Sequence, residues 1–241
     1  MRLIWEDIEK VILKVENIHT YYGESYILQG ISLEINQGEI VTLLGRNGAG
    51  KTTAIKSIVG LIPPKRGAIV YQQKNLVNRK PYEIVRLGIG YVPEDRRIFT
   101  TLTVLENLQV AEGKRKGMWN LESIFALFPR LEERREHKGN QLSGGEQQML
   151  AIARSLMGNP ELLLVDEPSE GLAPIIVEGI ATAIKSMKTQ GMSVLLVEQN
   201  VLMTLKLADR HYVIDSGKII YQGLNEELMA NREIQKKYLS V

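Results

Sequence analysis

The chain of 241 residues has no cysteine, and it is also poor in aromatic residues and in net charge. Without cysteine it can form neither disulfides nor thiolate metal sites, and it has no cysteine nucleophile, which fits a reducing compartment. The formal net charge is only +2, and no basic block with interleaved aromatic residues occurs. The composition therefore argues against a nucleic-acid partner.

Long apolar runs are also missing. None approaches the roughly 18 residues that a membrane-spanning helix needs. The first ten residues carry Glu6, Asp7 and Glu9 where a signal peptide requires an uninterrupted apolar core. We therefore expect a cytoplasmic protein that acts on a membrane only through partners.

Residues 45–53 read Gly-Arg-Asn-Gly-Ala-Gly-Lys-Thr-Thr, which matches the phosphate-binding P-loop G-x-x-x-x-G-K-[ST]. An apolar run at 39–44 precedes the motif, and a helical apolar pattern over 55–62 follows it, as a P-loop requires. Glycines let backbone N–H groups converge on an anion, Lys51 can reach the β- and γ-phosphates, and Thr52 can bind Mg²⁺. The predicted nucleotide-binding residues of this loop are Asn47, Gly48, Ala49, Gly50, Lys51, Thr52 and Thr53.

The order of apolar patterns predicts an α/β protein with a helical insertion. Period-two and continuous apolar runs predict strands near 11–15, 31–35, 68–71, 87–92, 162–165 and 194–197, and a hairpin over 212–221. Helical patterns predict one helix over 121–131, a charged helical face over 131–138, a helix opening at Ser143, another over 175–189 and a charged helical tail from Glu226. The segment from about 100 to 158 is predicted to be mainly helical, and predicted strands lie both before and after it, so it is an insertion into an α/β core.

The apolar run at 162–165 ends in Asp166 and Glu167. Asp166 is placed to hold Mg²⁺, directly or through water, because that ion prefers oxygen ligands. Glu167 could accept a proton from a water molecule that attacks the γ-phosphate. We predict that Asp166 and Thr52 hold the metal, and that Glu167 is the general base.

The segment 142–148, Leu-Ser-Gly-Gly-Glu-Gln-Gln, combines a serine cap with two glycines at a helix start. Bare N–H groups at such a start form a second anion site in the same chain. Together with the P-loop and the strand that ends in Asp166 and Glu167, this segment resembles the signature of ATP-binding cassette (ABC) ATPases. The resemblance covers essentially residues 11–241.

The resemblance implies a P-loop NTPase (RecA-like) core, an N-terminal antiparallel β subdomain and an inserted helical subdomain. We expect one ABC ATPase domain over 11–241, with core segments 11–95 and 159–241, a helical subdomain at 96–158 and an N-terminal extension at 1–10. It also implies a head-to-tail dimer in which the P-loop of one subunit and the signature of the other hold each ATP. The predicted signature contacts are Ser143, Gly144, Gly145 and Glu146.

Other positions match the family pattern or depart from it. Tyr22 matches the aromatic residue that stacks on adenine, with Tyr21 as a competitor, and Ile27 matches the apolar residue beside it. Glu94 stands where the family has a glutamine that senses Mg²⁺ and the attacking water. Gln199 stands where most members have a switch histidine, and Ala173 replaces an interface aspartate. Glu94 and Gln199 are nevertheless predicted to take part in catalysis, with Glu94 also near the metal.

The particular residues within the motifs indicate which ABC subfamily the chain resembles. Pro-Glu-Asp-Arg-Arg-Ile-Phe at 93–99, Glu-Pro-Ser-Glu-Gly-Leu-Ala-Pro at 167–174 and Val-Glu-Gln-Asn at 197–200 resemble the ATPase subunit of branched-chain amino acid importers. The ATPase subunits of urea and short-amide importers share most of these motifs and remain an alternative. The implied cofactors are ATP and Mg²⁺, and the implied partners are two transmembrane permease subunits and a second ATPase subunit, identical or similar. A solute-binding protein would act only indirectly, and the chain would sit on the inner face of the cell membrane.

Three other readings stay open on the sequence. A soluble ABC ATPase for DNA repair or translation usually carries two cassettes or long coiled coils, which this chain lacks. A GTPase or small-molecule kinase has no use for the signature segment, and no N-K-x-D guanine motif is present. A non-hydrolysing, ATP-gated scaffold is suggested by Gln199, whereas the presence of Glu167 argues against it.

Overall fold

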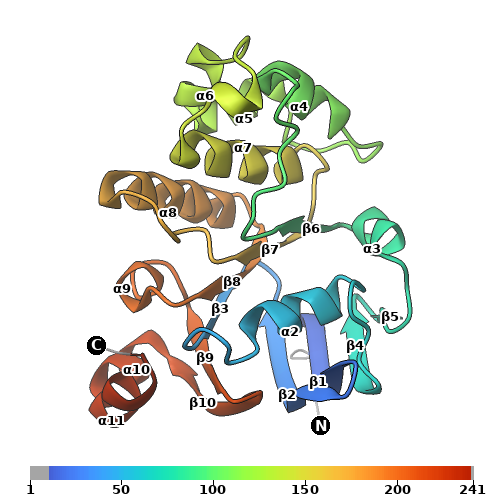
Figure 1. The fold of residues 1–241 in the computed structure, drawn as a ribbon, viewed down its shortest axis with the longest axis vertical. Coiled ribbons are helices and arrows are strands. Elements are labelled where there is room, and N and C mark those ends of the chain that lie inside the picture. Colours follow the sequence, from blue (N-terminus) through green and yellow to red (C-terminus); the bar gives the residue numbers. More distant parts are fainter. Residues whose placement is uncertain (1–10, 240–241) are drawn as a thin grey trace, which may run out of the picture.

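The computed structural model describes residues 11–239, which form two β-sheets with helices around them (Figure 1). The central sheet has the order β10-β9-β3-β8-β7-β6. Its strands are β3 (Ile40–Leu44), β6 (Ile89–Val92), β7 (Leu162–Asp166), β8 (Ser193–Glu198), β9 (Arg210–Asp215) and β10 (Lys218–Leu224). Strands β9, β3, β8, β7 and β6 are parallel, and β10 pairs antiparallel with β9.

Residues of the parallel strands are buried on both faces, as their continuous apolar sequences predict. Because alternate side chains point to opposite faces, Leu163 and Val165 pack toward helices α7 (Gly144–Leu156) and α8 (Pro174–Thr189), whereas Leu162 and Leu164 pack toward the N-terminal strands. The predicted hairpin over 212–221 is confirmed as β9 and β10, with Asp215 opposite Lys218.

The second sheet is antiparallel and has the order β2-β1-β4-β5. Its strands are β1 (Val11–Tyr22), β2 (Ser25–Asn36), β4 (Arg66–Tyr71) and β5 (Lys74–Asn75). Strands β1 and β2 are longer than the apolar patterns predicted, because register irregularities after Val11, Val15, Ile18 and Thr20 interrupt the alternation without ending the pairing.

Short helices cluster at the end of the molecule opposite the antiparallel sheet (Figure 1). They are α4 (Val104–Val110), α5 (Leu121–Leu127) and α6 (Pro129–Glu133), packed near α7. The predicted single helix over 121–131 is wrong, because Phe128 leaves the helical region just before Pro129 and the chain starts a new helix. The charged segment 131–138 is helical only to Glu133. Helix α3 (Pro81–Leu87) had not been predicted at all.

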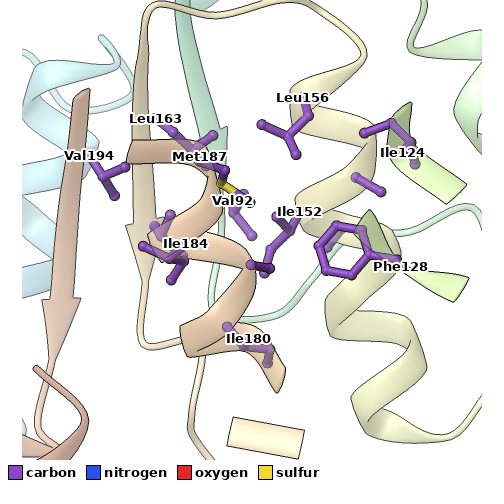
Figure 2. Close-up of a cluster of buried hydrophobic side chains, with 14 of the residues drawn as sticks. Val92, Ile124, Phe128, Ile152, Leu156, Leu163, Ile180, Ile184, Met187 and Val194 are labelled. Atoms are coloured by element: carbon purple, nitrogen blue, oxygen red, sulfur yellow. The ribbon is translucent and has the colours of Figure 1, made fainter. Parts of the chain in front are cut away.

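Helix α7 shares a core with the central sheet rather than forming one of its own. Figure 2 shows Ile152 and Leu156 of α7 pointing at Ile184 and Met187 of α8, with Val92 and Leu163 of the sheet beside them. Phe128 and Ile124 extend the same cluster toward α5. The helical end is therefore joined to the strands that carry the candidate site.

Residues after β10 form helices α10 (Asn225–Ala230) and α11 (Arg232–Ile234) and a final turn over Gln235–Leu239. Leu228 and Leu239 pack there against Leu44 of β3 and against Val201 of α9 (Val201–Thr204). None of the helices formed within residues 11–239 combines the length and apolar composition needed to cross a bilayer. The α/β architecture with an antiparallel β region and an inserted helical region is confirmed. The predicted domain limits stay predictions, and the extension at 1–10 lies outside the described residues.

Candidate functional site

The P-loop connects buried strand β3 to helix α2 (Lys51–Ile58). Gly48 and Gly50 have φ angles of 80° and 111°, a region that residues with a Cβ rarely adopt. Gly50 begins the helix without any side-chain cap, so the first N–H groups of α2 are open to an anion. The turn between β9 and β10 supports the loop, since the Gly217 N–H donates to the Ala49 carbonyl at 2.9 Å.

A cavity of about 230 Å³ lies over this loop. Its lining brings together most of the nucleotide-binding residues predicted in the loop 47–53 with Ile27 and Glu167, namely Ile27, Gly48, Gly50, Lys51, Thr52, Thr53 and Glu167. Asn47 is exposed beside it at the tip of the loop, and Ala49 is buried beneath. Ile27 thus lies beside the P-loop, and its contact with a nucleotide stays a prediction.

Lys51 and Glu167 meet in this cavity. The Lys51 Nζ atom lies 2.9 Å from Glu167 Oε1 and donates to the Arg46 carbonyl at 3.1 Å. Both side chains are largely withdrawn from water, at 3% and 10% exposure. Glu167 has a φ of 45°, a strained backbone that its N–H stabilises by donating to Val197 O at 2.9 Å. Strain of this kind is often found at reacting groups.

Asp166 is fully buried at the end of β7. Thr52 Oγ1 donates to Asp166 Oδ1 at 3.1 Å, whereas Asp166 Oδ2 has no hydrogen-bond partner among the described residues. Burial, together with the charges of Glu167 and Glu94, raises the pKa of Asp166 to about 6. A buried carboxylate oxygen without a partner is costly, and the hydroxyl–carboxylate pair provides the hard oxygen ligands that Mg²⁺ prefers. The residues present therefore fit the ion.

Two further predicted residues lie on neighbouring strands. Glu94 follows β6, whose Val92 pairs with Val165 of β7, so Glu94 lies near the Asp166 end of the sheet. Partial desolvation and the Glu170 carboxylate raise the pKa of Glu94. Gln199 follows β8 and its side chain is exposed. Sequence reasoning had missed Glu170 as a neighbour of Glu94, because only the folded loop brings the two carboxylates together.

Tyr21 and Tyr22, at the end of β1, lie in different surroundings. The Tyr21 ring stacks on Tyr26 with centroids 4.5 Å apart, and Lys65 Nζ lies 4.5 Å from the Tyr21 centroid. Tyr22 is 45% exposed, and its ring has no stacking partner within residues 11–239. The Tyr21 ring is thus engaged in the hairpin and the Tyr22 ring is not, and neither tyrosine lines the P-loop cavity.

The signature segment 142–148 lies away from the P-loop cavity of the same chain. Ser143 caps α7, accepting from the Glu146 N–H at 3.3 Å, and Glu146 Oε2 accepts from the Ser143 N–H at 2.8 Å. Glu146 also lies within 4 Å of the arginines 130 and 134, so its carboxylate is already engaged. A Cβ on Gly145 would come within 2.7 Å of Ile176, so this glycine also lets α7 pack closely on α8. Neither Ser143 nor Gly144 lines the P-loop cavity of the same chain.

The sequence profile of the ABC transporter family matches residues 28–170, more than half of the chain. The chain belongs to the ABC transporter family. It is therefore an ATPase, which binds and hydrolyses ATP.

Full-length relatives and solved structures agree with this assignment. BraG of Pseudomonas aeruginosa, a high-affinity branched-chain amino acid transport ATP-binding protein, is 44% identical and aligns over 95% of this chain and 99% of BraG. LptB of Haemophilus influenzae, a lipopolysaccharide export system ATP-binding protein, is 36% identical over 95% of this chain and 97% of LptB. The ADP conformation of MJ1267, an ATP-binding cassette of an ABC transporter, superimposes with a TM-score of 0.82 at 28% identity, covering 94% of this chain and 97% of MJ1267.

Glu198 is a residue of this ABC ATPase that sequence reasoning missed. It is 1% exposed at the end of β8. Its Oε1 accepts from the Ser169 N–H at 3.0 Å, and its Oε2 accepts from the N–H groups of Gln199 and Asn200 at 3.0 Å each. One carboxylate thus joins the loop after Glu167 to the segment that begins with Gln199. The only sequence signal was an acidic residue at the end of an apolar strand.

We expect Glu198→Gln to lower both the stability and the turnover of this ABC ATPase. A glutamine offers one acceptor oxygen, so its NH₂ group would face either the Ser169 N–H or the other two N–H groups. Leaving such donors unsatisfied costs about 1–3 kcal/mol, and a chain of this size loses about 2–4 °C in Tm per kcal/mol. Thermal unfolding and kcat measure both effects. Glu178→Gln, at an exposed position of α8, is the control, and equal melting of the two variants would contradict the expectation.

We expect Tyr22→Ala to weaken ATP binding by about 1–3 kcal/mol, the typical contribution of one base stacked on an aromatic ring. Tyr22→Phe keeps the ring and should retain the affinity. Equilibrium titration with a fluorescent ATP analogue gives the Kd. Tyr82→Ala removes a similarly exposed tyrosine from helix α3 and is the matched control. If Tyr21→Ala weakened binding while Tyr22→Ala did not, the two tyrosines would have the opposite roles.

Proposed function

We infer that this chain is the ATP-hydrolysing subunit of an importer for branched-chain or similar hydrophobic amino acids. The observation that carries the proposal is the 44% identity to BraG along nearly the whole of both chains. Two sequence motifs that resemble this importer subfamily also support the proposal, at Pro93 to Phe99 and at Val197 to Asn200. LptB, whose name describes an exporter, is 36% identical over a similar length, so the direction and the solute need their own experiment.

Within the ATP site each group has a proposed task. Tyr22 and Ile27 hold the adenine, and the loop 47–53 wraps the phosphates, with Lys51 on the β- and γ-oxygens. Thr52 and Asp166, with Glu94 nearby, hold Mg²⁺, which when bound neutralises charge between the β- and γ-phosphates. Because a γ-phosphate competes for the Lys51 ammonium, Glu167 is released to accept a proton from the attacking water. Gln199 donates a hydrogen bond to the γ-phosphate without becoming charged.

The signature segment acts on the ATP of a second subunit. In a head-to-tail dimer the exposed Ser143 and the start of α7 complete the site of the partner, while Gly145 and Glu146 hold that helix start in shape. Dimer formation, though not its head-to-tail geometry, is supported by the similarity to a dimeric ATP-binding cassette, MJ0796 bound to ADP and Pi, which superimposes with a TM-score of 0.78 at 28% identity, over 88% of this chain and 98% of MJ0796. The partner is a second copy or a similar ATPase.

Two permease subunits are the proposed membrane partners, with this chain on the cytoplasmic face of the membrane. An apolar groove of about 430 Å³ between α3 and α7 is the proposed contact. It adjoins the loop after Glu94, so that a change at the γ-phosphate could be transmitted to the membrane subunits. The groove is open to solvent on this chain, since Leu61 and Val85 of its lining are exposed.

Uptake measurements test the proposed solute. A strain that lacks the gene is complemented with the wild type or with Glu167→Gln, and uptake of labelled leucine, urea and acetamide is followed. Loss of leucine uptake, restored only by the wild type, is the expected result. Loss of urea or acetamide uptake alone would favour the amide importer, and no change in any uptake, with a soluble-only location, would favour a non-transport ABC ATPase.

A further inference from the structure

The proposed ATP site is assembled from two parts of the fold that belong to different sheets. Tyr22 and Ile27 lie in the β1–β2 hairpin of the antiparallel sheet, whereas the loop 47–53 follows β3 of the central sheet. A nucleotide contacts both parts only if their spacing matches the spacing between its base and its phosphates. Holding the two parts at that spacing before the nucleotide arrives lowers the ordering cost of binding.

A buried pair of hydroxyl groups joins the hairpin to the P-loop helix. Thr20 of β1 and Ser57 of α2 are 0% and 3% exposed, and their hydroxyl oxygens lie 2.9 Å apart. The Ser57 hydroxyl donates to the Thr53 carbonyl at 2.8 Å, so its proton is already engaged. The Thr20 hydroxyl therefore donates to Ser57 Oγ. This hydrogen bond fixes β1 to α2 at a point only two residues before Tyr22.

A second connection passes through the turn between β9 and β10. The Gln29 N–H of β2 donates to the Gly217 carbonyl at 2.8 Å, and the Gly217 N–H donates to the Ala49 carbonyl of the P-loop at 2.9 Å. Gly217 is buried and has a φ of 76°, and a Cβ there would lie 1.9 Å from the Ile27 carbonyl oxygen. Any larger residue would therefore push Ile27 away from the loop.

The hairpin is stiff enough to transmit this spacing to its end. The Tyr21 and Tyr26 rings stack with an angle of 8° between their planes, and the Tyr26 hydroxyl pairs with the His19 ring. Lys65 lies over the Tyr21 ring, and its N–H donates to the His19 carbonyl at 2.8 Å. Because these contacts hold the end of β1 on both sides of Thr20, a shift at Thr20 moves the end of the strand with it.

We propose that Thr20 and Gly217 are positioning residues for the nucleotide. They hold the β1–β2 hairpin at the distance from the P-loop at which Tyr22 reaches the adenine while the loop 47–53 holds the phosphates. Both act through other residues, Thr20 through Tyr22 and Gly217 through Ile27. The inference rests on the proposed roles of Tyr22 and Ile27 in the ATP site.

The test compares the Kd for ATP with the Kd for tripolyphosphate, which offers a phosphate chain without the base. Both are measured with Mg²⁺ by displacement of a fluorescent ATP analogue. We expect Thr20→Val, which keeps the shape but removes the hydroxyl, to raise the Kd for ATP by about 3- to 10-fold, the range for one hydrogen bond. The Kd for tripolyphosphate should stay unchanged. Thr20→Ser keeps the hydroxyl and should retain the wild-type affinity for ATP.

Thr204→Val is the control for the loss of a buried hydroxyl. Thr204 is 0% exposed and donates to the Val201 carbonyl within α9 at 2.8 Å. Whatever the effect of this variant on Tm, neither Kd should change. A general loss of stability is thereby distinguished from a loss of positioning.

Gly217→Ala acts on the same spacing from the other side of the hairpin. Its Cβ displaces Ile27, so the Kd for tripolyphosphate divided by the Kd for ATP should fall further than in Thr20→Val. Gly191→Ala is the control for backbone strain, because Gly191 has a φ of 83° and no atom within 4 Å of an added Cβ. If Gly217→Ala does not fold, the Thr20 variants decide the inference on their own.

Tyr22→Ala separates failure of this inference from failure of the proposed site. It should lower the ratio of the two Kd values, and adding Thr20→Val should lower it no further, because Thr20 acts through the missing ring. If Tyr22→Ala lowers the ratio but Thr20→Val leaves it unchanged, the inference is overturned and the site stands. If Tyr22→Ala leaves the ratio unchanged while Lys51→Ala raises both Kd values, the role of Tyr22 is overturned together with the inference.

Discussion

Glu167→Gln is expected to lower kcat for ATP hydrolysis by about 10²–10⁴-fold, the usual contribution of a positioned general base. Glutamine has nearly the same shape but cannot accept the proton of the attacking water. ATP should still bind, because the P-loop, Thr52 and Asp166 are untouched. The neutral amide also frees Lys51 from its ion pair, so ATP-bound subunits should accumulate as dimers, which light scattering detects. Single-turnover hydrolysis gives the rate.

Glu112→Gln, an exposed carboxylate in the loop after α4, is the control and should hydrolyse ATP like the wild type. A Glu167→Gln protein that remains monomeric with ATP and turns over at the normal rate would remove Glu167 from the role of base. Another carboxylate of the site, Glu94 or Glu170, would then become the candidate.

Lys51→Ala is expected to weaken ATP binding by about 1.5–3 kcal/mol, the range for hydrogen bonds to charged groups, which corresponds to roughly a 10- to 150-fold higher Kd. The loss has two sources. The phosphates lose a cation that is held in place by the Arg46 carbonyl, and Glu167 keeps its negative charge in the cavity without the neighbour that now balances it. Isothermal titration with ATP and Mg²⁺ measures the change.

Lys74→Ala removes an exposed lysine of β5 and should leave the Kd unchanged, which controls for the loss of one positive charge. Because Lys51 screens Glu167, the two variants should not be additive. The double variant Lys51→Ala/Glu167→Gln should bind ATP more tightly than Lys51→Ala alone, since it no longer places a carboxylate against the γ-phosphate. An unchanged Kd for Lys51→Ala would contradict the P-loop assignment.

The sequence alone was sufficient to predict those features that depend on residues close together in the chain. The P-loop and the capping box of Ser143 and Glu146 depend on residues within a few positions of one another, so spacing predicts both correctly. The parallel strands were predictable for a related reason, since burial on both faces leaves continuous apolar runs such as 162–165. The pattern of apolar residues failed for two short helices. The helix predicted over 121–131 breaks at Phe128 and Pro129. Helix α3 has only seven residues, of which Ile84 alone is buried while Tyr82 and Val85 are exposed, so it shows no helical apolar period.

Tertiary structure alone decided which distant groups meet. Nothing in the spacing of Lys51 and Glu167 indicates an ion pair, and nothing near Asp166 indicates that one of its oxygens is buried without a partner among residues 11–239. The same holds for Glu198, which joins two loops. Hydrogen bonds and charge interactions act over a few ångströms in space. Only the fold brings residues that are far apart in the sequence within that distance.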